Sequence, residues 1–157
     1  MNRSGRMRIA MCTVVVGGAL AGPVAGASAS DASIKAVIKS YNSKILVAEG
    51  HALTALGEYK STGNPANVQS ALTQSIDVLS SLKSKIAGQS ASSTRVKEGK
   101  AKFEKGLASV IVAYRRLKTA IGEKKSSPQA AKTEAKKAVS AVKVARKELI
   151  EGAKLLS

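Results

Sequence analysis

The chain has one histidine, His51, and imidazole is the side chain most often used for metal binding and proton transfer. No Glu-x-x-His pair accompanies it, so the usual helical pattern of metal ligands is missing. The nearest acidic residues are Glu49, two positions before it, and Glu58, seven positions after it. His51 also lies beside Ala48 and Ala52 in an apolar helical pattern. We interpret His51 as a residue at the boundary of a core, and we expect no metal site.

Two carboxylates near the C-terminus have a spacing that acid–base chemistry could use. Glu148 and Glu151 are three positions apart and would share one face of a helix. Lys147 lies four positions before Glu151, however, so an ordinary ion pair along the helix explains this acid. The chain has no Gly-x-Ser-x-Gly or P-loop motif and a single cysteine, Cys12. We therefore predict a non-enzymatic protein without a cofactor. A carboxylate site assembled from different helices is the alternative.

Lysines recur near the C-terminus at a spacing that places them along one side of a helix. They are spaced by steps of four and seven: Lys132, Lys136, Lys143, Lys147 and Lys154. Arg115 and Arg116, which follow Tyr114 in the preceding segment, would broaden this surface. We predict that these seven residues form an anion-binding surface on the third and fourth helices. The competing interpretation is a solvated face that keeps the protein soluble.

The charge of the chain is unevenly distributed. Residues 92–157 contain 17 Lys and Arg against six Asp and Glu, whereas residues 30–91 contain six Lys against four acids. Such asymmetry favours an anionic partner, with an affinity that falls as salt rises. Aromatic residues make up 3% of the chain, so bases would find few stacking partners, which disfavours nucleic acid. We expect an anionic envelope polymer or a lipid surface, although a bundle would need the apolar residues that lie beside the lysines.

The first 29 residues have the three parts of an export signal. Arg3, Arg6 and Arg8 form a basic start, an apolar run of about a dozen residues follows, and the segment ends in Ala27-Ser28-Ala29. The run is shorter than the roughly 20 residues that a spanning helix needs. We predict cleavage after Ala29, or two residues earlier after Ala27, and a protein that is secreted or associated with the cell envelope.

The remaining 30–157 segment has four stretches in which apolar residues step by four and three. This period is typical of bundle helices, and Asn64-Pro65 and Ser127-Pro128 are typical helix starts. Lys100 is the only charged residue in these seams. We predict one all-α domain, an antiparallel up-down-up-down four-helix bundle, with a dimerising helical hairpin as the alternative. The predicted helices span residues 31–60, 65–88, 93–122 and 128–156.

Two pairs of glycines, Gly50/Gly57 and Gly99/Gly106, are each seven positions apart and therefore share a helix face. They indicate either close approach of two helix backbones or a groove for a partner. Our main hypothesis is an exported binding module for an anionic cell-envelope component. The first alternative is a protein-interaction module that binds a protein partner or forms a homo-oligomer through glycine-faced grooves. The weaker alternative is a small-ligand carrier or enzyme with a site inside the bundle.

Overall fold

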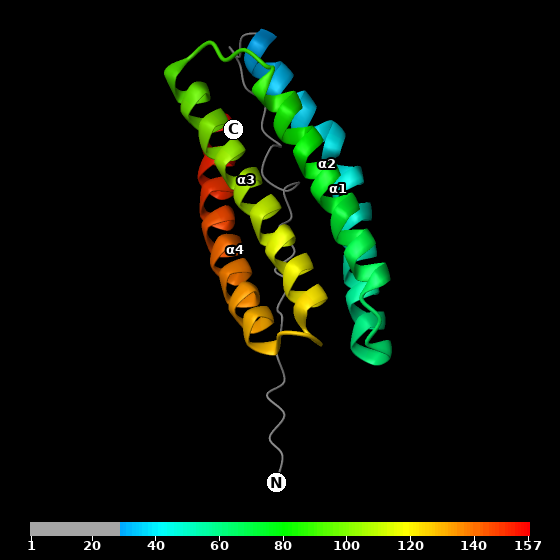
Figure 1. The fold of residues 1–157 in the computed structure, drawn as a ribbon. Coiled ribbons are helices and arrows are strands. Elements are labelled where there is room, and N and C mark those ends of the chain that lie inside the picture. The colour runs from blue at the N-terminus through cyan, green and yellow to red at the C-terminus, as the bar shows by residue number, and fades with distance from the viewer. Residues whose placement is uncertain (1–28) are drawn as a thin grey trace.

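The computed structural model describes residues 29–157, and all the regular structure in this part of the chain is helical (Figure 1). The structure has four helices, as the sequence predicted. Each helix end lies within two residues of its predicted position. Residues 1–28, which hold nearly all of the predicted signal peptide, lie outside the described residues. The four helices are α1 (Ala29–Thr62), α2 (Ala66–Ala87), α3 (Thr94–Glu123) and α4 (Pro128–Leu156).

Short polar turns separate the helices, and their residue types explain where each helix begins and ends. Gly63 has a φ of +69°, a left-handed conformation that glycine adopts without strain, and it follows the last residue of α1. The Asn64 side-chain oxygen then accepts a hydrogen bond from the Ala66 N–H at 3.0 Å. Ser93 accepts one from the Val96 N–H at 3.2 Å and so caps α3.

Two details at the helix ends differ from simple expectation. Ser127 precedes Pro128 as predicted, but its side chain makes no capping hydrogen bond. Lys100, the charged residue of the predicted seams, uses its ammonium group for a contact between helices. Its Nζ donates to the carbonyl oxygens of Ala87 at 2.8 Å and Gln89 at 2.6 Å. A lysine of α3 therefore satisfies free carbonyls at the C-terminal end of α2, where a cation is also favoured by the helix dipole.

The predicted apolar seams form the core, which receives side chains from all four helices. Positions at the four–three steps are buried throughout α2 and at most positions of the other three helices, although Val96, Lys100 and Tyr114 of α3 are only half-buried. Phe103 is the largest fully buried side chain, and aliphatic residues surround it. The larger of the two apolar clusters includes Ile34, Ile38, Ile45, Ile76, Leu79, Leu82, Ile86, Phe103, Leu107, Val110, Ala145, Leu149 and Leu156.

Helices α3 and α4 pack more closely than any other pair, and glycines make this possible. A Cβ atom on Gly106 would lie 2.6 Å from Cγ of Leu149, and one on Gly152 would lie 2.7 Å from the backbone nitrogen of Phe103. Gly99 is equally enclosed by the last turns of α4. Close backbone approach therefore explains the pair Gly99/Gly106.

The other glycine pair has a different environment. A Cβ atom on Gly50 or Gly57 would meet nothing within 4 Å in the part of the chain that the structure describes, and both residues are exposed on α1. Close packing also joins α1 to α2 and α2 to α3, whereas α1 and α4 approach each other far less. Among residues 29–157, one face of α1 is thus left without a partner helix over this stretch.

Candidate basic interface

The acidic and basic side chains of α4 are sorted onto different sides of the helix. All three acids of α4 pair with cations of α3: Glu134 with Arg116 at 2.8 Å, Glu148 with Lys105 at 2.6 Å, and Glu151 with Lys102 at 2.8 Å. Residues early in α3 pair with residues late in α4. The side of α4 that faces α3 is therefore neutralised by ion pairs.

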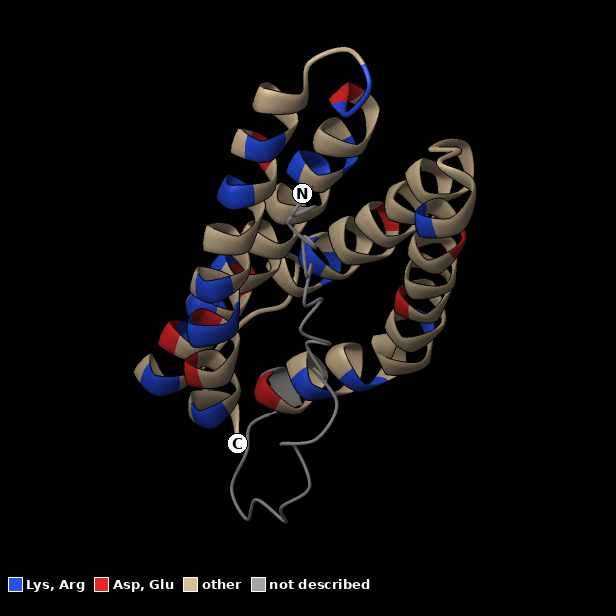
Figure 2. Ribbon diagram, turned by 90° about the horizontal axis from the view of Figure 1, so that it is seen from below, with Lys and Arg blue, Asp and Glu red and all other residues tan. Residues whose placement is uncertain are grey.

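The opposite side of α4 keeps its positive charge. Five exposed lysines lie there, and within residues 29–157 none has a carboxylate oxygen within 4.0 Å of its Nζ. On the ribbon in Figure 2, the positions of Lys and Arg are more frequent along the α3–α4 pair than along α1 and α2. We call this row the lysine stripe: Lys132, Lys136, Lys143, Lys147 and Lys154. The structure places all five on one side of α4, as their spacing predicted.

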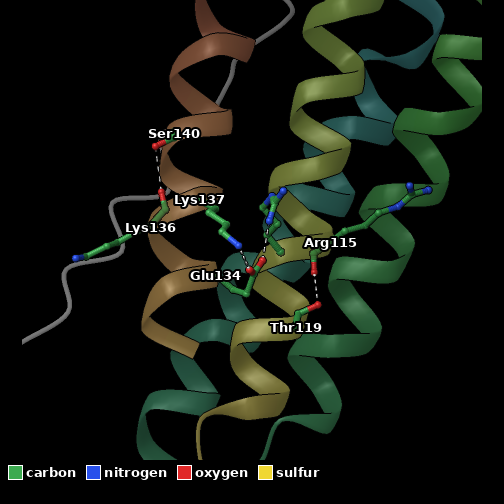
Figure 3. Close-up of polar contacts among 7 residues, drawn as sticks. Arg115, Thr119, Glu134, Lys136, Lys137 and Ser140 are labelled. Carbon is green, nitrogen blue, oxygen red and sulfur yellow. Dashed lines mark hydrogen bonds and ion pairs between the residues drawn. The ribbon is translucent and has the colours of Figure 1, made fainter. Parts of the chain in front are cut away.

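The two arginines of the predicted surface do not join the lysine stripe. Arg116 is partly buried and bonded to Glu134, which also accepts a hydrogen bond from Lys137 at 2.7 Å. Arg115 is exposed but points away from α4, whereas Lys136 points outward from the far side of α4 (Figure 3). The surface with unpaired positive charge is consequently narrower than the sequence indicated, because it lies on α4 alone.

The expected pair between Lys147 and Glu151 is replaced by a contact between helices. Glu151 bonds to Lys102 of α3 at 2.8 Å. This hydrogen bond lowers the pKa of Glu151 and raises the pKa of Lys102. Lys147 contributes only its more distant charge to Glu151, so it stays available in the lysine stripe.

Two aliphatic side chains interrupt the lysine stripe. Val139 is 50% exposed and Ile150 is 46% exposed, and both lie at positions that continue the four–three spacing of the lysines. The bundle does not use them, although it does bury the neighbouring Leu149. The expectation that the bundle would bury the apolar residues beside the lysines is therefore wrong for Val139 and Ile150. Along one exposed face, single aliphatic side chains therefore separate groups of lysines.

One buried acidic residue was not recognised from the sequence. Glu49 is 8% exposed, and its carboxylate accepts a hydrogen bond from the Tyr114 hydroxyl of α3. Burial raises the pKa of Glu49 to about 7, and this hydrogen bond offsets part of the rise. Oε2 of Glu49 has no hydrogen-bond partner among the described residues. His51, the residue with the clearer sequence signal, is exposed.

Other kinds of site have little support in the part of the chain that the structure describes. In residues 29–157, no three His, Cys, Asp or Glu side chains come together as metal ligands would. Over the same range, no helix has the length and apolarity that crossing a bilayer requires. A shallow surface pocket lies where α3 and α4 meet their connecting turn, lined by Thr119, Glu123, Gln129, Ala130, Thr133 and Glu134.

Comparison with known proteins adds no relative. No protein-family model matches the chain, and no curated protein or solved structure is significantly similar to it. Function must therefore be inferred from the chemistry of the chain itself.

Proposed function

We propose that this protein is exported, loses its signal peptide after Ala29 or Ala27, and works outside the cytoplasm as an antiparallel up-down-up-down bundle without enzymatic activity. Its task is to bind an anionic component of the cell envelope through the lysine stripe. The chemistry required of the ligand is a row of phosphate or carboxylate groups, as in an anionic envelope polymer or the headgroups of an anionic lipid surface.

The observation that carries this proposal is the sorting of charge on α4. A helix that needed lysines only for solubility would gain stability by pairing them with acids at i,i+4 spacing. Here the three acids of α4 bond to α3, and Lys132/Lys136 and Lys143/Lys147 remain as like-charge pairs at that spacing. Each like-charge pair costs about 0.2–0.5 kcal/mol in an isolated helix. An anionic ligand would remove this repulsion when it binds.

Binding to isolated cell envelopes of the native host tests the proposal. We expect the protein to sediment with envelopes at low salt and to be released at high salt, because exposed charges are screened over about 10 Å at 0.1 M salt. The variant Lys136→Glu/Lys143→Glu/Lys147→Glu should remain in the supernatant at low salt. If it sediments as the wild type does, the lysine stripe is a solvated face and the proposal is wrong.

A matched control separates the position of the charges from their number. Lys39→Glu/Lys85→Glu/Lys97→Glu changes the net charge equally at exposed lysines of α1, α2 and α3. It should retain most envelope binding. Extracting the lipids from the envelopes with solvent then distinguishes the two sources of negative charge. Retained binding points to the polymer, and lost binding points to lipid headgroups.

A further inference from the structure

The exposed face of α1 has an apolar pattern that neither the bundle nor the proposed function uses. Leu46, Val47 and Leu53 are 56%, 58% and 44% exposed, and they are three of the seven large apolar side chains that are exposed in the described part of the chain. Leu46, Gly50, Leu53 and Gly57 follow one another at steps of four, three and four. They therefore lie in one row along the helix, with leucines and glycines alternating.

This row is complementary to itself when it is turned end for end. If a second copy of α1 lies antiparallel across it, with the two-fold axis between positions 50 and 53, Leu46 faces Gly57 of the second copy. Leu53 likewise faces Gly50 of the second copy. Each leucine then enters a space that the missing glycine side chain leaves, and the symmetry makes all four contacts at once.

The protein already uses the same packing inside its own fold. Leu149 of α4 lies directly on Gly106 of α3, so close that a Cβ atom there would come within 2.6 Å of the leucine Cγ. At the matching positions on α1, a Cβ atom on Gly50 or Gly57 would meet no atom of the described residues within 4 Å. The glycine of α3 is therefore covered by a leucine of a neighbouring helix, whereas the glycines of α1 are open to such a contact.

Charge also permits this pairing of two basic molecules. In the antiparallel register, Lys60 faces Ser43 of the second copy, and Lys39 lies beyond Thr62, where α1 of the second copy ends, so no lysine of the row meets another lysine. Glu58 is held on the other side of α1 by a 3.0 Å hydrogen bond from Asn67. The lysine stripe belongs to α4, away from the row. The contact zone itself is therefore uncharged.

From these observations we propose that two copies of the protein dimerise through α1, antiparallel, with Leu46, Gly50, Leu53 and Gly57 of each copy forming the contact. The occupant of this face is a second copy of the same chain, because a two-fold partner presents the same alternation in reverse order and so places a glycine opposite each leucine. The dimer would present two lysine stripes, but the inference stands independently of what those stripes bind.

Cysteine cross-linking between differently tagged copies tests both the dimer and its direction. Cys12→Ser is introduced first, so that the only thiols are those placed on α1. Leu46→Cys and Gly57→Cys chains are then mixed under mild oxidation. Leu46 and Gly57 are separated by about 16 Å along a helix, beyond the roughly 7 Å Cα–Cα limit of a disulfide. The antiparallel dimer therefore gives the mixed disulfide and no homodisulfide of either variant.

Each other outcome of this experiment contradicts the proposal. Homodisulfides of each variant would indicate a parallel pair, and the absence of any disulfide at high protein concentration would indicate that this face stays solvated. Sedimentation velocity of the wild type supplies a second readout. A monomer at every concentration tested would overturn the dimer.

A variant that fills the hollow separates dimerisation from folding. Gly50→Leu adds a side chain where the described structure leaves open space, so the bundle should fold at least as well as the wild type. The dimer should nevertheless weaken at least tenfold, because Leu53 of the second copy loses its space. Val112→Leu, which enlarges an exposed apolar residue of α3 outside the row, is the matched control and should dimerise normally.

Discussion

Glu49 of α1 and Tyr114 of α3 share a hydrogen bond inside the bundle, and the tyrosine hydroxyl is the donor. The two residues come from the two halves of the chain, so this contact joins the helix pair α1–α2 to the pair α3–α4. Burial raises the pKa of both groups, and the negative charge of Glu49 raises that of Tyr114 further. The contact is therefore a polar link whose strength depends on pH.

The raised pKa of Glu49 predicts that the protein becomes less stable as the pH increases toward neutrality. Its pKa is about 7 in the folded state against an ordinary value of 4.5, so the folded state holds this proton more tightly. The stabilising contribution is complete below pH 4.5, decreases between pH 4.5 and 7, and is lost above pH 7. A shift of this size corresponds to roughly 3 kcal/mol.

Glu49→Gln isolates this contribution. Glutamine can still accept the hydrogen bond from Tyr114 but cannot ionise, so the variant should be more stable than the wild type at pH 8 and similar to it at pH 4.5. Urea unfolding at half-unit pH intervals measures the difference. A constant difference in the free energy of unfolding from pH 4.5 to 8 would show that Glu49 has the same, ordinary pKa in the folded and unfolded states.

Acid should act in the opposite direction through the ion pairs between α3 and α4. Hydrogen bonds from Lys137 and Arg116 lower the pKa of Glu134, and the bond from Lys102 lowers that of Glu151. These acids therefore stabilise the fold above their ordinary pKa of 4.5, and this contribution is lost as the pH falls through their lowered values.

Glu134→Gln/Glu151→Gln should consequently lower the stability at pH 6 and flatten its decrease below pH 4.5. Thermal unfolding at pH 6, 4 and 3 is the measurement. Glu98→Gln is a suitable control, because Glu98 is exposed and makes no ion pair within residues 29–157. If the stability of the double variant decreases as steeply below pH 4.5 as that of the wild type, other groups cause the decrease.

Glycines that look alike in the sequence should respond to alanine with opposite signs. Gly57→Ala should stabilise the protein by about 0.5–1 kcal/mol, because alanine is the better helix former and the site is open. Gly152→Ala should destabilise it by about 1–3 kcal/mol or more, because the new Cβ atom would lie 2.7 Å from the backbone nitrogen of Phe103. Unfolding at low protein concentration, where dimer formation does not contribute, compares the two variants.

The glycine pairs also show what the sequence could and could not predict. The four–three steps predicted the helices and nearly every core position. The reason is that each helix must bury its apolar face, so large apolar side chains such as Leu72 and Phe103 on that face enter the core. The environment of a glycine depends instead on which helix lies opposite. Gly50/Gly57 and Gly99/Gly106 have identical spacing, yet only the second pair is covered. Spacing along one helix does not contain that information.

The same limit applies to the candidate site: positions along one helix were predictable, and contacts between helices were not. The spacing of the lysines placed them correctly on one side of α4. The pairing of Arg116 with Glu134 was not predictable, because it depends on the rotation of α3 against α4. Glu49 was missed for a similar reason: its partner Tyr114 is 65 positions away in the chain. A glutamate directly beside an apolar seam, at the Ala48 edge, was the available signal.

The aliphatic residues within the lysine stripe predict how the protein distinguishes a lipid surface from a polymer. Val139 and Ile150 are about half exposed between lysines, a combination that can lie in the surface of an anionic bilayer. If lipid headgroups are the ligand, Val139→Ser/Ile150→Ser should weaken binding to phosphatidylglycerol vesicles by about tenfold, because burying an aliphatic side chain fully contributes roughly 1.5–3 kcal/mol and these two are half exposed. Flotation of vesicles with and without phosphatidylglycerol measures the affinity.

The same variant has a second use, because a soluble polyanion offers no apolar phase. If an anionic polymer is the ligand, Val139→Ser/Ile150→Ser should leave binding to lipid-extracted envelopes unchanged. Lys136→Glu/Lys143→Glu/Lys147→Glu should abolish it. Val144→Ser is the control, since Val144 is 47% exposed but lies on another side of α4. If Val144→Ser weakens vesicle binding as much as the double variant does, the lysine stripe does not orient the protein on the bilayer, and general hydrophobic adsorption explains the binding.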